Sequence, residues 1–170
     1  GYADIEKKTK ILPSKTRFRI GSFSKTLAAS ALMKLVEEGK IDLDSSIYFY
    51  IPDYPKKRWE FTSRQIAGHL SGIRHYKGDE MMINEDFLNV KEALSVFKTD
   101  SLLHEPDTKF SYSTHAWTLL SAVIENASGE PFLDYMQANV FDLLDMNNTH
   151  AEEKDLIGVE KVSYYYLDST

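Results

Sequence analysis

The amino-acid sequence predicts an α+β fold in which the body of the chain is helical and short strand pieces lie at its two ends. Two observations support this prediction. Apolar residues recur every three or four positions along residues 27–36 and 113–127, as they do on the buried face of an amphipathic helix. Residues 16–20 alternate between polar and apolar, and residues 162–167 are rich in tyrosine, and both patterns are typical of β-strands.

The N-terminal part of the chain is expected to run from strand to helix. Residues 1–10 are predicted to form a strand fragment and a charged turn, and residues 11–15 form a second turn around Pro13. After the strand at 16–20, one apolar stripe marks a helix, and it consists of Leu27, Ala28, Ala31, Leu32, Leu35 and Val36. Gly39 follows this helix in the position of a left-handed C-terminal cap.

The rest of the chain is expected to be helical as far as about residue 141. Thr62 and Gln65 form a Thr-x-x-Gln capping box, which predicts a short helix that ends at Gly72. A second helix is predicted over residues 86–98. Its apolar positions fall on one side, and they are Phe87, Val90, Leu94 and Phe97.

The strongest helical pattern covers residues 113–127. Its apolar stripe contains Ala116, Leu119, Leu120, Val123, Ile124 and Ala127. Gly129 ends this helix, and Pro131 suits the first turn of a further helix over residues 132–141.

Composition narrows the classes of function. With 170 residues, of which 42% are hydrophobic and 27% charged, the chain has the balance of one globular domain or of a piece of one. The net charge of −6 and the lack of a basic stripe argue against nucleic acid as the main partner. No apolar run approaches the ~20 residues of a transmembrane helix. The basic cluster at residues 56–59 is expected to be a solvated loop.

Residue patterns for metal, nucleotide or thiol chemistry are missing from the sequence. There is no cysteine, the five histidines show no metal-ligand spacing, and no glycine-rich phosphate loop occurs. We therefore expect no cofactor and no metal site.

Ser22 and Lys25 are the leading catalytic candidates. They lie three residues apart where the strand gives way to a helix, so both side chains share one helix face. A serine nucleophile needs an adjacent base, and a neutral lysine amine serves when burial or positive neighbours lower its pKa. The spacing alone supports an alternative equally well, in which Ser22 caps the helix and Lys25 is a surface residue.

A second Ser-x-x-Lys sequence occurs at Ser95 and Lys98. It falls at the end of the helix predicted over residues 86–98, where a lysine complements the helix dipole. We interpret this copy as a solvated last turn. Tyr112, before the strongest helix, is the candidate that passes a proton to the leaving group, and the alternative is an aromatic residue that packs against the helix start. His69 and His75 are alternative bases, although His69 is better explained as a structural hydrogen-bonding residue.

Three segments together resemble the class C β-lactamase and penicillin-binding protein family. Residues 17–40 contain its Ser-x-x-Lys motif, and residues 68–76 resemble its His-Thr-Ser-Gly-Ile segment. Residues 112–129 and 132–136 resemble its tyrosine-centred second motif and the helices that follow. These segments cover most of residues 1–150 in family order, and they are closest to the subgroup of mitochondrial serine β-lactamase-like proteins and their bacterial relatives.

The resemblance implies a β-lactamase/transpeptidase-like fold, with a helical domain packed on an antiparallel sheet and the site between them. It implies that Ser22 attacks a carbonyl to form an acyl-enzyme, while Lys25 and Tyr112 share the proton transfers. Thr114 stands where β-lactamases commonly carry a substrate-binding Asn, so it is expected to contact substrate. This difference favours an esterase or peptidase over an antibiotic-degrading β-lactamase. Asp107 stands where the family usually has glycine.

The family's third motif, Lys/His-Thr-Gly, has no match in residues 151–170. We therefore expect residues 1–170 to form a single but incomplete β-lactamase-like domain. It would be inactive alone and part of an active serine hydrolase at full length.

The expected partners are small-molecule or peptide substrates with ester, amide or β-lactam bonds, and a homo-oligomer remains open. The compartment is left open as periplasmic or extracellular in a bacterium and mitochondrial in a eukaryote. A non-catalytic structural, ligand-sensing or self-assembling module on the same scaffold is the alternative function.

Overall fold

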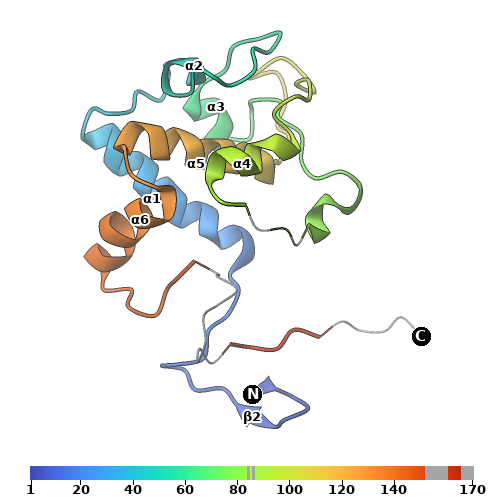
Figure 1. The fold of residues 1–170 in the computed structure, drawn as a ribbon, viewed down its shortest axis with the longest axis vertical. Helices are drawn as coiled ribbons and strands as arrows, with labels where there is room; N and C mark the ends of the chain where they lie inside the picture. Colours follow the sequence, from blue (N-terminus) through green and yellow to red (C-terminus); the bar gives the residue numbers. More distant parts are fainter. Residues whose placement is uncertain (84, 86, 152–160, 166–170) are drawn as a thin grey trace.

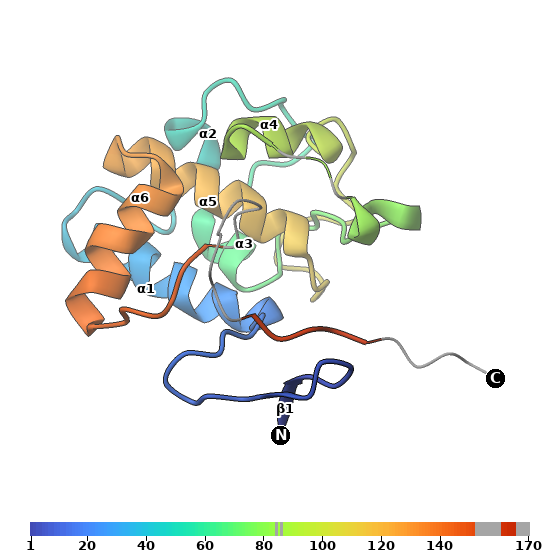
Figure 2. The same cartoon turned by 60° about the horizontal axis from the view of Figure 1, so that its bottom comes forward.

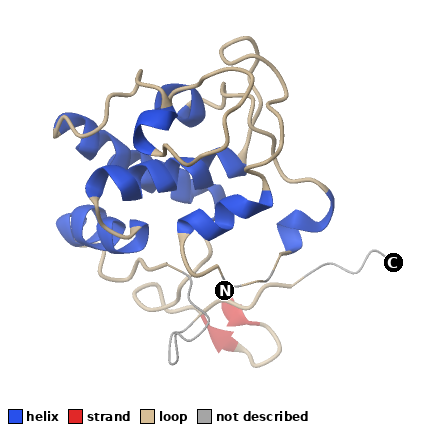
Figure 3. Cartoon of the chain, turned by 45° about the horizontal axis from the view of Figure 1, so that its top comes forward, coloured by secondary structure: helices blue, strands red, loops and turns tan. Residues whose placement is uncertain are grey.

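The computed structural model describes residues 1–83, 85, 87–151 and 161–165, and it shows a helical body with a small β-hairpin beside it (Figure 1). Figure 3 shows the two strands at the edge of the molecule, away from the helices. The α-helices are α1 (Ser24–Glu37), α2 (Ile47–Tyr50), α3 (Ser63–Ala67), α4 (Val90–Ala93), α5 (Thr114–Ser128) and α6 (Phe132–Met136). The strands are β1 (Tyr2–Asp4) and β2 (Thr9–Lys10).

Helix α5 is the centre of the core. It is contacted by α1, α2, α3, α4 and α6, which surround it in Figure 2. Its buried side chains are His115, Ala116, Leu119, Leu120, Ala122, Val123 and Ile124. The Ser113 hydroxyl accepts a hydrogen bond from the Ala116 N–H at 3.0 Å, and Gly129 closes the other end at φ +77°. The helix predicted over residues 113–127 is therefore confirmed within one residue at each end.

Local signals also place α1 and the start of α3 correctly. The predicted end of α3 at Gly72 is wrong, because the helix ends at Ala67 and His69 then turns the chain with φ +60°. The buried residues of α1 fall on the predicted stripe, and Gly39 adopts φ +69° as a left-handed cap. At α3, the Thr62 side chain accepts from the Gln65 N–H at 3.3 Å, and the Gln65 side chain accepts from the Thr62 N–H at 2.9 Å. The predicted capping box is thus present in both directions.

The helix predicted over residues 86–98 is wrong at both ends. Helix α4 begins only at Val90, because the Asn89 side chain accepts a hydrogen bond from the Glu92 N–H at 2.9 Å and caps the helix there. Phe87 precedes this cap, so it does not lie on the helix. The last turn continues as a 3₁₀ segment over Leu94–Val96 and stops before Lys98. Residue 86 lies outside the described residues.

The helix predicted over residues 132–141 changes its winding partway along. Helix α6 covers Phe132–Met136, and a π-helical turn over Gln137–Phe141 follows it directly. Val140 and Phe141 are buried in this turn, so the apolar pattern continues beyond the regular helix. Pro131 precedes the first helical residue of α6, as predicted.

Strand structure at the chain ends is smaller than predicted. β1 pairs with β2 in an antiparallel hairpin, but among the described residues of the segment 16–20 only Arg17 forms a β-bridge, with Lys161. The Val162 N–H donates to the Arg17 carbonyl at 3.1 Å, and the Ser163 N–H donates to the Ala3 carbonyl at 2.8 Å. The segment 161–163 therefore lies beside the N-terminal part of the chain, as Figure 1 shows. Residues 166 and 167 of the predicted C-terminal strand lie outside the described residues.

Candidate active site

Ser22, Lys25 and Tyr112 meet at one place on the surface. The Lys25 ammonium donates a hydrogen bond to Ser22 Oγ at 3.1 Å, and Ser22 Oγ lies 2.7 Å from Tyr112 Oη. The Lys25 Nζ atom also lies 5.1 Å from the centre of the Tyr112 ring. The structure thus brings together the three residues that the sequence nominated for chemistry.

The local backbone explains why Ser22 and Lys25 meet. Gly21 adopts φ +52°, a conformation that favours glycine, and a 3₁₀ turn over Gly21–Phe23 leads into α1. Such a turn has three residues per turn, which aligns side chains three positions apart. Neither this turn nor α1 has a side-chain cap, so Ser22 is not the helix cap that the alternative interpretation required.

The second Ser-x-x-Lys sequence does not form such an arrangement. Ser95 is an exposed residue in the 3₁₀ segment at the end of α4, and no hydrogen bond joins it to Lys98. The Lys98 N–H instead donates to the Leu94 carbonyl at 2.8 Å, which closes the last turn. The interpretation of this copy as a helix end is consistent with these contacts.

The Tyr112 phenol lies in an environment that favours its ionised form. The Lys25 ammonium, and after it the Ser22 hydroxyl, lower the pKa of Tyr112 below its ordinary value because both stabilise the phenolate. The Thr114 hydroxyl acts in the same direction, and burial opposes these effects. A lowered pKa increases the fraction of phenolate near neutral pH, and the phenolate is the form that accepts a proton.

The segment 68–76 holds Tyr112 in place from behind. The Ser111 N–H donates to the His69 carbonyl at 2.8 Å, and the Ser113 N–H donates to His69 Nδ1 at 3.1 Å. The Thr114 N–H donates to His75 Nδ1 at 3.2 Å. These contacts agree with the interpretation of His69 as a hydrogen-bonding residue, while the matching role of His75 was missed.

A partly buried ionic cluster, which no local sequence pattern predicts, supports this segment. The Arg74 guanidinium binds both oxygens of Glu80, at 2.6 and 2.8 Å, and Asp100 at 2.6 Å. His115 Nε2 lies 3.0 Å from Glu80 Oε2. The Arg74 hydrogen bonds lower the pKa of Glu80 to about 2. The cluster joins residues from positions 74, 80, 100 and 115, so only the folded chain brings them together.

Thr114 and Asp107 are the two positions where the sequence differs from the family pattern. Thr114 is the first residue of α5, half-buried beside Tyr112, and its predicted contact with substrate stays a prediction. Asp107 adopts φ +66°, which explains why a glycine is usual at this place in the family. Aspartate tolerates this left-handed conformation better than most residues do.

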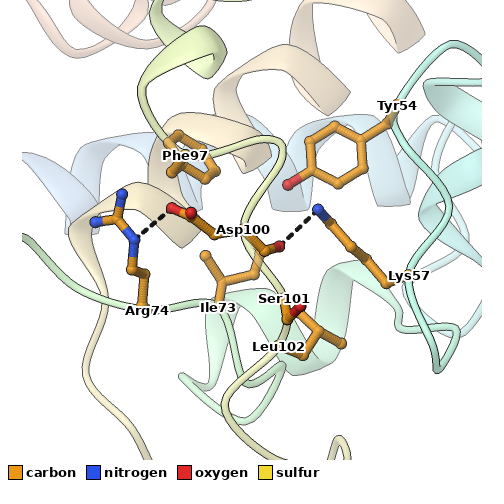
Figure 4. A pocket seen from close by; sticks show the side chains of 8 residues that line it. All are labelled: Tyr54, Lys57, Ile73, Arg74, Phe97, Asp100, Ser101 and Leu102. Carbon is orange, nitrogen blue, oxygen red and sulfur yellow. Dashed lines mark hydrogen bonds and ion pairs between the residues drawn. The ribbon is translucent and has the colours of Figure 1, made fainter.

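Two cavities of the described part of the chain lie away from these residues. One encloses about 10 Å³, roughly the space of a single water, and Figure 4 shows that its charged side chains are already paired. There the Lys57 ammonium donates to the Asp100 carbonyl at 2.7 Å, and Arg74 binds the Asp100 carboxylate. A larger groove of about 310 Å³ runs between residues 55–59 and 99–102. Neither is lined by Ser22, Lys25 or Tyr112, so the candidate site is an open surface.

The described part of the chain contains neither a metal-binding cluster nor a helix that could cross a membrane. No group of three or more histidine, aspartate or glutamate side chains is placed there to hold a metal ion. None of the described helices is long and apolar enough to cross a membrane.

Comparison with known sequences gives a consistent family match. The β-lactamase family model matches residues 1–168. The human mitochondrial serine beta-lactamase-like protein LACTB is 32% identical over 97% of this chain and 42% of its own length. Protein flp of Staphylococcus aureus strain MW2 is 26% identical over 94% of this chain and 34% of its own length. The chain therefore spans less than half the length of these relatives.

Solved structures resemble the chain in the same way. An octameric penicillin-binding protein homologue from Pyrococcus abyssi has a TM-score of 0.83 at 26% identity, covering 99% of this chain and 40% of that one. EstCE1, a hydrolase with promiscuous acyltransferase activity, has a TM-score of 0.76 at 27% identity and covers 85% and 42%. The D-amino acid amidase of Ochrobactrum anthropi SV3 has a TM-score of 0.72 at 28% identity and covers 86% and 41%. The chain belongs to the β-lactamase family, and its helices are the helical part of a β-lactamase/transpeptidase-like fold.

Proposed function

We propose that the protein is a serine hydrolase that forms an acyl-enzyme at Ser22 and cleaves an ester or an amide. The observation that carries this proposal is the hydrogen-bonded group of Lys25, Ser22 and Tyr112. A serine hydroxyl needs a neighbouring base in order to attack a carbonyl at neutral pH, and here it has two polar neighbours at hydrogen-bond distance. Similar solved structures that include a hydrolase with promiscuous acyltransferase activity and an amidase support the same class of reaction.

In the proposed reaction, the ionised Tyr112 phenol takes the Ser22 proton while Ser22 Oγ bonds to the substrate carbonyl carbon. The Lys25 ammonium stabilises the phenolate before this step, and it offsets the negative charge that develops on the substrate oxygen. When the bond to the leaving group breaks, Tyr112 returns the proton to that group. A water molecule then attacks the acyl-Ser22 ester while Tyr112 takes a proton from it. When the bond between the acyl carbon and Ser22 Oγ breaks, Tyr112 gives this proton to Oγ, and the acid product and free Ser22 are released.

Ester and amide substrates are proposed ahead of β-lactam hydrolysis because of Thr114. A threonine hydroxyl is shorter than the asparagine amide that β-lactamases commonly carry at this place, and it cannot offer both a donor and an acceptor to a substrate amide in the same geometry. Turnover of a p-nitrophenyl ester, compared with turnover of a chromogenic cephalosporin, tests this preference directly. Faster cephalosporin turnover would contradict it.

Labelling of the full-length protein with a fluorophosphonate tests the nucleophile. Ser22→Ala should abolish the label and the mass increase that accompanies it. Ser24→Ala and Ser95→Ala are matched controls, because Ser24 lies in the same motif and Ser95 begins its second copy. Both controls should label as the parent does. Equal labelling of Ser22→Ala would overturn the proposal.

Self-assembly of the full-length protein is a separate proposal, supported by the similarity to an octameric penicillin-binding protein homologue. Light scattering across a concentration series measures it. Assembly that survives Ser22→Ala, in a protein that neither labels nor turns over an ester, would favour the alternative function as a non-catalytic, self-assembling module.

A further inference from the structure

The N-terminus of α5 is held in an unusual way, by the side chains of two histidines. The first N–H groups of a helix have no partner inside the helix, and a side-chain oxygen usually accepts from one of them. Here the Ser113 and Thr114 N–H groups, which directly follow Tyr112, donate to the Nδ1 atoms of His69 and His75 at 3.1 and 3.2 Å. Both bonds require an imidazole whose Nδ1 carries no proton.

The same two rings contact the Tyr112 side chain. The His69 ring centre lies 4.4 Å from that of Tyr112 with the planes tilted by 36°, and the His75 ring meets it edge-on at 5.3 Å. Tyr112 is exposed over 39% of its surface, so few other groups restrain it. The position of the Tyr112 hydroxyl relative to Ser22 therefore depends on the two histidines, which contact the Tyr112 ring and bind the backbone N–H groups of the two residues after it.

The segment that carries the histidines is itself firmly held. The Arg74 carbonyl accepts a hydrogen bond from the Ser113 hydroxyl at 2.7 Å, and the Arg74 guanidinium is anchored by Glu80 and Asp100. His69 adopts φ +60°, a conformation that is uncommon for a residue other than glycine. A strained residue of this kind persists only where the surrounding structure fixes it.

The groups that face the His69 ring oppose its protonation. Burial, then the positive charge of Lys25 on α1, then His75 lower the pKa of His69 below its ordinary value. Phe110 and Trp117 pack against His69 without charge. The His75 ring packs against the rings of Tyr76 and Tyr112.

We propose that His69 and His75 are positioning residues that hold Tyr112 against Ser22, and that protonation of His69 sets the acid limit of the Ser22 reaction. A proton on Nδ1 of His69 would place two donors opposite each other at Ser113, so the hydrogen bond is lost. A displacement of about 1 Å at a reacting group costs on the order of 10²-fold in rate. This inference rests on the proposed acyl-enzyme function of Ser22.

The test is the pH dependence of ester hydrolysis by the full-length protein, in two substitutions of His69. His69→Phe keeps a ring against Tyr112 but removes the acceptor, so kcat should fall about 10- to 100-fold at pH 8 with KM changed by less than about threefold. His69→Asn places a non-titrating oxygen close to the Nδ1 position, and asparagine tolerates a positive φ. It should therefore recover most of the lost kcat and move the acid limit to lower pH.

His150→Asn is the matched control, because it removes an exposed histidine that makes no contact with Tyr112. Its pH profile should be that of the parent. The inference is overturned if His69→Asn keeps the parental acid limit, or if His69→Phe, folded by circular dichroism, keeps the parental kcat. If His69→Phe does not fold, the pH profile of His69→Asn alone decides. Hydrolysis that persists in Ser22→Ala would instead refute the proposed function.

Discussion

Replacing Glu80 with glutamine is expected to lower the free energy of unfolding by about 2–3 kcal/mol near neutral pH. The pKa of Glu80 is lowered from an ordinary 4.5 to about 2, chiefly by its hydrogen bonds with Arg74. At about 1.36 kcal/mol for each pH unit between these values, the ionised carboxylate contributes at most about 3 kcal/mol. The Glu80 side chain is 15% exposed and that of Arg74 only 10%, so solvent screens the pair only in part.

The same argument fixes the pH range of the effect. The pKa of Glu80 is lower in the folded protein than in the unfolded chain, so its contribution is complete above about pH 4.5. The contribution is lost as the pH falls from there toward about 2, where the folded-state carboxylate takes up its proton. Glutamine does not titrate. The Glu80→Gln variant should therefore lose less stability than the parent over this acid range.

Urea denaturation of the full-length protein at pH 7 and at a series of pH values below 5 measures both effects. Asp44→Asn is the control, because Arg64 and Asp44 form a similar two-point pair, at 2.6 and 2.8 Å, that is more than half exposed. Exposed pairs contribute little to stability, so this variant should change the unfolding midpoint far less. Equal losses in the two variants, or an unchanged acid slope in Glu80→Gln, would refute the reasoning.

Four further predictions concern the site and its scaffold. Tyr112→Phe should lower kcat about 10²–10⁴-fold in ester hydrolysis at pH 8. Lys25→Ala should lower kcat in the same assay, because the cation that stabilises the Tyr112 phenolate is gone. Gly72→Ala should unfold at a lower urea concentration than Gly129→Ala. Both glycines have φ +77°, so the backbone strain of an alanine is similar at the two positions. A Cβ at Gly72, however, would lie 2.5 Å from the His104 carbonyl oxygen, whereas a Cβ at Gly129 meets nothing within 4 Å. Thr114→Asn should raise the ratio of the acylation rate by a fluorescent penicillin to the acylation rate by an ester about tenfold, because one added hydrogen bond contributes about that much. An unchanged ratio would argue against contact between residue 114 and the substrate.

Elements with complete local signals were predictable from the sequence. Helix α3 begins at the capping box of Thr62 and Gln65, and α5 ends at Gly129, because these residues satisfy backbone groups that lie within a few positions of them. The start of α4 was predicted too early, because apolar residues at helical spacing also occur before Asn89. The hydrogen bond of the Asn89 side chain, and not the apolar spacing, determines where this helix begins.

The candidate site was predictable only in part for a similar reason. Ser22 and Lys25 are three residues apart, so their contact follows from local backbone geometry. Tyr112 is 90 residues from Ser22, and only the family resemblance linked the two before the fold was known. His75 and Arg74 carry no motif that assigns them a role. Their partners on α5 and at Glu80 are visible only once the chain is folded.

The direct packing of α1 on α5 links the candidate site to the core. Ser22 precedes α1, Lys25 lies in its first turn and Tyr112 precedes α5, so the register between these two helices sets the distance between the Ser22 and Tyr112 hydroxyls. Leu35 on α1 and Leu120 on α5 are fully buried in one core. If the proposed function holds, a core substitution that shifts one helix along the other would change this distance while all three site residues stay the same.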